Sequence, residues 1–212
     1  MESWGWLERW AVAMCAAAGL GVLAMVTNIT TDEQLSGQAD AWLTARSFLS
    51  NLVNSGTVWG GLLVLAGWLV RHRWQAMVAG VLAGELALFV HYGLAEACGP
   101  LLPVAQPGFE DNGYWFVAAA IFGAPLGLIG ALAHRAGRVG VVATLVVPIG
   151  AIIEPFFLGQ FTRLAMVHWP THVSSFLSGV VLVVAGLMMT VKVLRGRASE
   201  HSSEHESPHV PV

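Results

Sequence analysis

The segment WQAMVAGVLAGELALFVHYGLAE, residues 74–96, decides the fold of this chain. As a helix rising ~1.5 Å per residue it can cross a hydrocarbon core of ~30 Å. It follows the basic triplet Arg71-His72-Arg73 and carries Glu85, which lies about 18 Å along the predicted helix, near mid-bilayer. An ionisable group at that depth costs roughly 2.5–3.5 kcal/mol on insertion scales, so Glu85 is a candidate functional residue.

The composition of the whole chain agrees with a membrane protein. Of its 212 residues, 56% are hydrophobic and 11% are charged, which is too apolar and too poor in charge for an ordinary soluble domain. Six apolar runs have the length that a bilayer requires. The sequence therefore predicts an all-α fold over residues 1–194, a six-helix transmembrane bundle in a lipid bilayer, with spans at residues 10–27, 52–70, 74–95, 114–132, 139–158 and 173–191.

The charges between these runs alternate in sign, which predicts the orientation. Acidic residues dominate the first and third connections, whereas arginines dominate the second and fourth and basic residues follow the last span. The positive-inside rule then places both termini in the cytoplasm of a multi-pass cell-membrane protein. The first span has weak basic flanking and no small-residue cleavage site, so we expect it to be retained. The polar segment 195–212 is expected to be a disordered cytoplasmic tail.

Charge and cysteine content exclude some classes. The net charge of −3 comes without a basic patch, so no nucleic-acid partner is expected. A single lysine, Lys192, accompanies nine arginines, and Ala, Gly and Val are abundant, which indicates a GC-rich bacterial genome. Cys15 and Cys98 fall at opposite ends of their predicted spans, so a disulfide between them is not expected.

Small residues predict how the helices pack. The motifs Gly56-x-x-x-Gly60, Gly80-x-x-x-Gly84 and Gly123-x-x-x-Gly127 allow close approach between membrane helices. In the first outer loop, residues 41–49 have helical apolar spacing, and we expect an interfacial helix there. Both features describe packing and do not specify a function.

Polar and aromatic residues gather in the outer half of the predicted bundle. On the third span Glu85, Phe89, Tyr92 and Glu96 follow helical spacing and share one stripe. A second acid, Glu154, lies about 24 Å up the fifth span. With Asn54 and Trp59 of the second span, these residues predict a water-accessible pocket, in which Trp59, Phe89, Tyr92, Glu96 and Asn54 bind a substrate and Glu85 and Glu154 do chemistry.

The chemistry of an isolated acid in a membrane depends on whether it carries a proton. No predicted span places a cation beside Glu85, and burial disfavours the charged form, so we expect its proton-bearing form to be populated. His168 and His172 have the spacing of a helical metal pair, with Glu154 near in topology. Pro170 between them disfavours a continuous helix, so no metal is expected there.

These residues suggest two functions. The first is an enzyme that uses a membrane acid to protonate an apolar substrate, with aromatic faces stabilising the developing cation. The stretch Asn54-Ser-Gly-Thr-Val-Trp-Gly-Gly and the acids Glu85 and Glu154 resemble those of small multi-pass bacterial membrane proteins and of the membrane-bound terpene cyclases of indole-terpenoid pathways. The resemblance implies that one of these acids starts the cyclisation or isomerisation of a prenylated substrate without a cofactor.

The second function is a proton-coupled transporter, or the substrate-binding subunit of one, with Glu85 and Glu154 as a relay. Six helices are few for a complete transporter, so this alternative requires a homo-oligomer or a partner subunit. A membrane scaffold without chemistry is the third alternative. In the first two cases the ligand is a hydrophobic small molecule.

Overall fold

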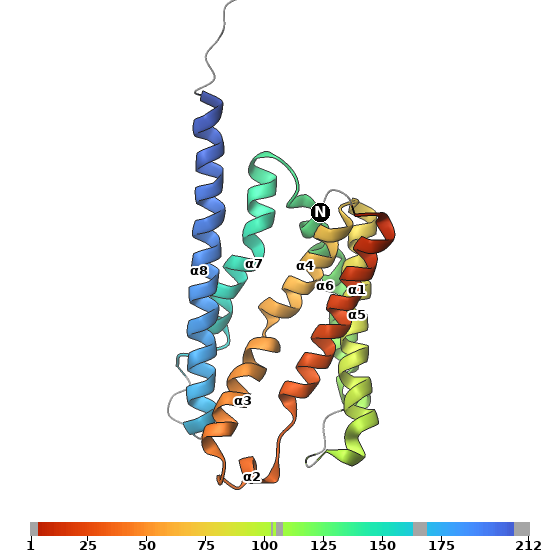
Figure 1. Cartoon of the computed structure of the whole chain (residues 1–212), viewed down its shortest axis with the longest axis vertical. Helices are drawn as coiled ribbons and strands as arrows, with labels where there is room; N and C mark the ends of the chain where they lie inside the picture. The colour runs from red at the N-terminus through yellow and green to blue at the C-terminus, as the bar shows by residue number, and fades with distance from the viewer. Residues whose placement is uncertain (1–3, 103, 105–107, 163–168, 206–212) are drawn as a thin grey trace, which may run out of the picture.

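The computed structural model describes residues 4–102, 104, 108–162 and 169–205, with side chains placed up to Gly196. Every regular element in these residues is helical, which confirms the all-α prediction (Figure 1). Six helical segments are long and apolar enough to cross a membrane. The elements are α1 (Trp6–Asn28), α2 (Asp32–Leu35), α3 (Asp40–Val53), α4 (Gly56–Val70), α5 (Arg73–Cys98), η1 (Gly99–Leu101), η2 (Glu110–Asn112), α6 (Gly113–Leu132), α7 (Gly137–Phe157) and α8 (Trp169–His205).

The second span differs from its prediction. It comprises two helices, α3 and α4, and extends over Asp40–Val70, whereas the sequence predicted residues 52–70. The expected interfacial helix at residues 41–49 is helical, but it is the first half of this span. It packs against α8 and α1.

Glycines bring three helices into close contact, as two of the three predicted motifs require. On α5, Gly80 meets the backbone of Gly123 on α6, and Gly127 of α6 meets the backbone of Ala76. Gly67 of α4 also meets Gly127. A side chain at these positions would overlap backbone atoms, so α4, α5 and α6 form a tightly packed unit.

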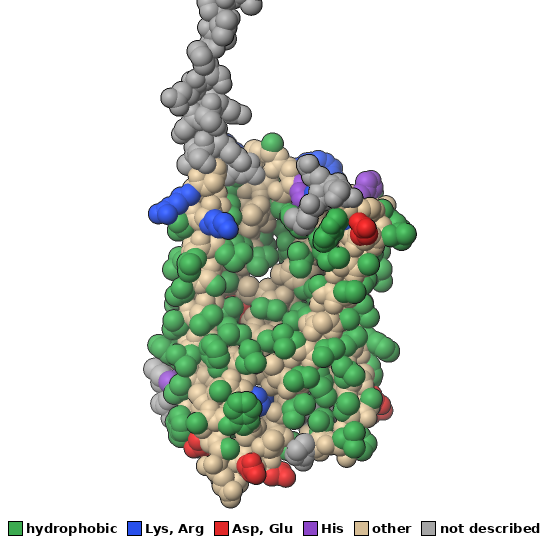
Figure 2. Space-filling view, in the orientation of Figure 1, with side chains coloured by type: hydrophobic (Ala, Val, Ile, Leu, Met, Phe, Trp, Pro, Cys, Tyr) green, Lys and Arg blue, Asp and Glu red, His purple; other side chains and the backbone are tan. Residues whose placement is uncertain are grey.

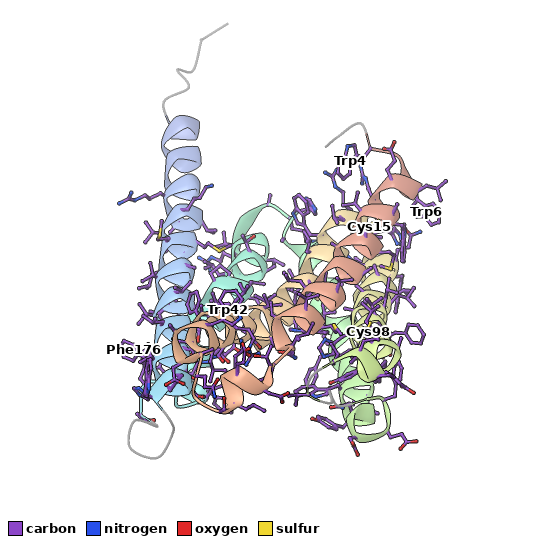
Figure 3. The ribbon with its side chains drawn as sticks, turned by 60° about the horizontal axis from the view of Figure 1, so that its bottom comes forward. Trp4, Trp6, Cys15, Trp42, Cys98 and Phe176 are labelled. Carbon is purple, nitrogen blue, oxygen red and sulfur yellow. The ribbon has the colours of Figure 1, made fainter. Side chains whose placement is uncertain are left out.

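The helices form two groups. Helices α1, α4, α5 and α6 pack together, and α7 packs mainly on α8. The α7–α8 pair is joined to the first group through α3, which lies along α8, whereas α7 makes few contacts with α4 and α6. Figures 1 and 3 show the α7–α8 pair set apart from α1 and α5. Cys15 and Cys98 are both free, as expected.

The surface is organised along the bundle axis. Hydrophobic side chains cover the middle of the face shown in Figure 2, with lysine and arginine near its upper end and acidic residues gathered near its lower end. The N-terminal end of α1 and the C-terminal end of α8 lie at the same end of the bundle (Figure 1). The cytoplasmic location of that end stays a prediction.

The last helix is longer than the predicted span and enters the segment expected to be disordered. Helix α8 continues to His205, because adding residues to an existing helix needs no new nucleus. The predicted tail of residues 195–212 is thus helical in its first part, and residues 206–212 lie outside the described residues.

Candidate functional site at a broken membrane helix

The second span is interrupted at Asn54 and Ser55, inside the membrane. Ser55 is the N-cap of α4 and its hydroxyl accepts a hydrogen bond from the amide of Val58. The amide of Asn54 bonds the carbonyl of Ser50, which completes the last turn of α3. Serine favours this cap position. With 15 residues in α4, the break lies about 22 Å from the end of the span at Val70.

The carboxylate of Glu154 completes the start of α4. Its Oε1 accepts a hydrogen bond of 2.6 Å from the amide of Gly56, and its Oε2 accepts one of 2.7 Å from the amide of Thr57. The hydroxyl of Thr57 also donates to Oε2. The first amides of a helix have no partner within the helix, and they carry the positive end of its dipole. The carboxyl group of Glu154 on α7 therefore occupies an anion-binding position at the start of α4.

This interaction crosses the boundary between the two groups of helices. Because α7 otherwise makes few contacts with α4 and α6, the three hydrogen bonds to Glu154 are the main polar link between α7 and α4 in the described residues. Two of the three donors are amides that can only donate, whereas the hydroxyl of Thr57 can also accept. Both an ionised and a protonated carboxyl can therefore occupy the position, with different numbers of accepted hydrogen bonds.

A cavity of about 930 Å³ lies beside Glu154, and we call it the α4–α7 cavity. Its walls are mostly apolar residues of α7 and glycines of α4, and its polar margin surrounds the helix break. The polar side chains that line it are Ser50, Asn51, Asn54, Ser55, Thr57, Glu154 and Gln160. A long apolar molecule with a polar group at one end fits this distribution.

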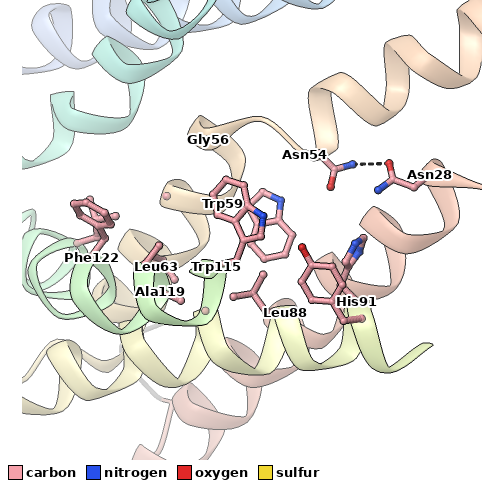
Figure 4. Close-up of a pocket in the computed structure, with 15 residues that line it drawn as sticks. Asn28, Asn54, Gly56, Trp59, Leu63, Leu88, His91, Trp115, Ala119 and Phe122 are labelled. Carbon is pink, nitrogen blue, oxygen red and sulfur yellow. Dashed lines mark hydrogen bonds between the residues drawn. The ribbon is translucent and has the colours of Figure 1, made fainter. Parts of the chain in front are cut away.

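A second cavity, of about 480 Å³, lies between α4, α5 and α6, and we call it the aromatic cavity (Figure 4). Trp59 of α4, Tyr92 of α5 and Trp115 of α6 line it. The two cavities share five lining residues, namely Asn54 at the helix break, Gly56 and Gly60 of α4, and Trp115 and Leu126 of α6. They therefore adjoin each other at the helix break.

Polar groups mark one end of the aromatic cavity. The side-chain amide of Asn54 donates a hydrogen bond of 3.1 Å to the side-chain oxygen of Asn28 (Figure 4), and the hydroxyl of Ser50 donates to the same oxygen at 2.6 Å. His91 also lines the cavity and stacks edge-on against Trp59 and Tyr92. Its Nδ1 is buried without a hydrogen-bond partner among the described residues.

The structure brings four of the predicted site residues to these cavities. Trp59 and Tyr92 line the aromatic cavity, Glu154 lines the α4–α7 cavity, and Asn54 lines both. Their role in function stays a prediction.

The other three predicted residues lie elsewhere. Glu85 lines neither cavity. Phe89 is 62% exposed and contacts the ring of Phe109, and Glu96 is exposed. The predicted stripe on α5 divides because the glycine face of this helix packs on α6, which buries Tyr92 and turns Phe89 outward.

Several lining residues did not emerge from the sequence. His91, Trp115, Asn28 and Thr57 line the cavities and were not among the predicted site residues. A usable signal was present, because Ser55-Gly56 is a helix-start pattern in the middle of an apolar run. Glu154, which binds this helix start, lies 98 residues further along the chain. No sequence pattern near Glu154 indicates this contact.

The expected absence of a metal stays an expectation. His168 lies outside the described residues. Within the residues that the structure describes, no cluster of three histidine, cysteine or acidic side chains could hold a metal ion. The described site therefore consists of a carboxylate, hydroxyls, amides, a histidine and aromatic rings.

The fold and the site together define a class of protein. It is a polytopic helical membrane protein in which one membrane helix is interrupted. The helix that begins after the break is capped by an acid from another helix. Comparisons with protein-family models, with curated proteins and with solved structures gave no match to this chain. Its function is therefore inferred from the site alone.

Proposed function

We propose that this protein binds an apolar or amphipathic small molecule at the break between α3 and α4 and moves it across or out of the bilayer in exchange for protons. The single observation that carries the proposal is the position of Glu154, whose carboxylate joins α7 to the start of α4 beside a cavity. Broken membrane helices whose ends face a cavity recur in the substrate and ion sites of secondary transporters. We propose the cell membrane as its location.

Glu154 acts as a proton-dependent link in this proposal. When ionised, it accepts hydrogen bonds from Gly56 and Thr57 and holds α7 against α4. When a proton binds Oε1, that oxygen becomes a weaker acceptor for the Gly56 amide, and the positive end of α4 loses its anion. The α7–α8 pair can then shift relative to the other helices, which opens or closes the α4–α7 cavity.

The cavity walls indicate the ligand class. Val142, Val146 and Ile153 of α7 line the α4–α7 cavity on one side, and Gly60 and Gly61 of α4 line the other. A hydrocarbon chain can lie along these residues while its polar group reaches Asn51 or Asn54 at the break. The aromatic cavity then holds the part of the ligand that passes Gly60.

The test uses the full-length protein in proteoliposomes that enclose a pH-sensitive dye. Farnesol, farnesoic acid and dodecyltrimethylammonium serve as neutral, anionic and cationic probes, added with and without an imposed pH difference. Wild type should give a probe-dependent change in internal pH that is absent from empty liposomes. Glu154→Gln should abolish the change, whereas the matched control Glu110→Gln, at an exposed position, should retain it. A wild type indistinguishable from empty liposomes with all three probes would refute the transport proposal.

A second function is favoured by the aromatic cavity. Trp59, Tyr92 and Trp115 offer ring faces to a cationic intermediate, and Glu154 reaches the adjoining space. Here Glu154 in its protonated form donates a proton to an alkene or epoxide of a prenylated substrate, the carbocation cyclises, and loss of a proton back to the carboxylate ends the reaction. Glu85 can take part only if the ligand reaches the outer face of α5, because it lines neither cavity.

The two functions differ in their products. Membranes that contain the wild type, Glu154→Gln or Glu110→Gln are incubated with linear prenylated indoles and extracted for mass spectrometry. New isomers of unchanged mass that depend on Glu154 would establish the cyclase. Unaltered substrate, together with the pH change described above, would establish transport.

A further inference from the structure

Glu85 lies on a stripe of α5 that lines neither cavity. Val78, Leu82 and Phe89 belong to the same stripe by helical spacing, and they are 52%, 46% and 62% exposed. Glu85 is partly exposed at the edge of this stripe. We call Val78, Leu82, Glu85 and Phe89 the α5 stripe. On this helix the cavities are lined by other residues, namely Gly84, Leu88, His91 and Tyr92.

The described chain offers Glu85 no partner. No hydrogen bond or ion pair to Glu85 occurs among the described residues. Arg9 and Arg73 lie in the first turns of α1 and α5, Arg46 lies midway along α3 and Lys192 lies near the end of the last span, and none of these described residues pairs with Glu85. A carboxyl group at mid-bilayer on the outside of the bundle therefore contacts lipid in a single copy of the protein. Acids in that position are costly and nearly always find a partner within the membrane.

We propose that the α5 stripe is the contact surface between two copies of this chain, related by a two-fold axis along the membrane normal. Copies inserted in the same direction keep every residue at its own depth, so Glu85 of one copy meets Glu85 of the other. Two neutral carboxyl groups satisfy each other, because each donates one hydrogen bond and accepts one. The interaction needs no cation, and the described chain provides none at this depth.

The shape of the surface agrees with a helix pair. Val78 and Phe89 are eleven residues apart, so the stripe runs about 16 Å along α5, with the acid between its ends. Because no residue of α5 lines the α4–α7 cavity, dimerisation through the α5 stripe leaves that cavity uncovered. The proposal does not depend on the proposed function.

Disulfide crosslinking in membranes tests this directly. Cys15 and Cys98 are first replaced by alanine, and single cysteines are then introduced as Leu82→Cys or Phe89→Cys. The matched control is Val181→Cys on α8, whose native side chain is 42% exposed at a similar distance from a helix end. Oxidation should give covalent dimers with the two α5 cysteines and few with the α8 cysteine. Equal crosslinking at all three positions, or none on α5, would overturn the proposal.

The role of the acid is tested separately by adding Glu85→Leu or Glu85→Gln and measuring dimerisation by fluorescence energy transfer in liposomes of increasing dilution. Leucine is compatible with lipid, so the variant should fold, which its gel-filtration profile verifies. It should weaken the dimer about tenfold, equivalent to about 1.4 kcal/mol, the size of an interhelical hydrogen bond in a membrane. Glutamine can pair with itself and should retain most of the association. Unchanged association in Glu85→Leu would refute the carboxyl pair.

Discussion

Replacing Glu154 with leucine should destabilise this protein more than replacing any other acid in its spans. The substitution removes the acceptor of two amides and one hydroxyl at the start of α4, namely those of Gly56 and Thr57. Leaving a buried donor without a partner costs about 1–3 kcal/mol. Measured interhelical hydrogen bonds in membranes are worth less, about 0.6 kcal/mol on average. For three donors these values bracket a loss between about 2 and 9 kcal/mol.

The link is tested by a double-mutant cycle with Thr57→Val, which removes one of the three donors and keeps the side-chain shape. Unfolding of purified protein is followed in detergent for both single variants and the double variant. Thr57→Val alone should cost about 1 kcal/mol, and little of that cost should remain in the Glu154→Leu background. Glu110→Leu serves as the matched control and should be additive with Thr57→Val. Additive effects of Glu154→Leu and Thr57→Val would refute the link.

Three further predictions concern residues around the cavities and the helix crossings. Gly127→Ala should destabilise the fold by about 3 kcal/mol, because its new methyl group would overlap the backbone of Ala76; thermal unfolding measures this. Gly60→Leu should leave the unfolding temperature nearly unchanged, since the nearest atom to a new Cβ is the Leu126 side chain at 3.8 Å, yet it should abolish probe binding because Gly60 lines both cavities. Trp59→Ala should lower the affinity for farnesol by about 1–3 kcal/mol, measured by calorimetry, through loss of an aromatic wall; unchanged affinity would place the ligand elsewhere.

The number and position of the spans were predictable because a membrane imposes a simple rule. A chain in lipid must satisfy its backbone polar groups internally, so each crossing is a helix of about 20 apolar residues. The span of α7 was expected at residues 139–158 and is found at Gly137–Phe157. The prediction was less accurate for the second span, because a polar break at Asn54 and Ser55 divides its apolar run and hides the membrane location of α3.

The site was predictable only in part. Depth along a helix can be counted, so Glu154 and Asn54 were placed at a common level, and the structure brings both to the α4–α7 cavity. Rotation about the helix axis is set by the neighbouring helices. The glycines through which α5 packs on α6 leave Tyr92 buried and Phe89 exposed. The sequence of α5 does not indicate which neighbouring helix packs on its glycines.

Glu154 and Glu85 show two ways in which the free-energy cost of an acid in a membrane span is offset. Glu154 accepts hydrogen bonds from its own chain, namely from the first amides of α4, which have no partner within their helix. These hydrogen bonds therefore satisfy both the carboxyl group and the amides. Glu85 has no such donor among the described residues and lies on the outer stripe of α5. The difference predicts opposite effects on a single copy. In detergent dilute enough to separate the copies, Glu85→Leu should preserve or raise the unfolding temperature, whereas Glu154→Leu should lower it. A lower unfolding temperature for Glu85→Leu under these conditions would show that the acid is satisfied within its own chain, and the dimer would lose its basis.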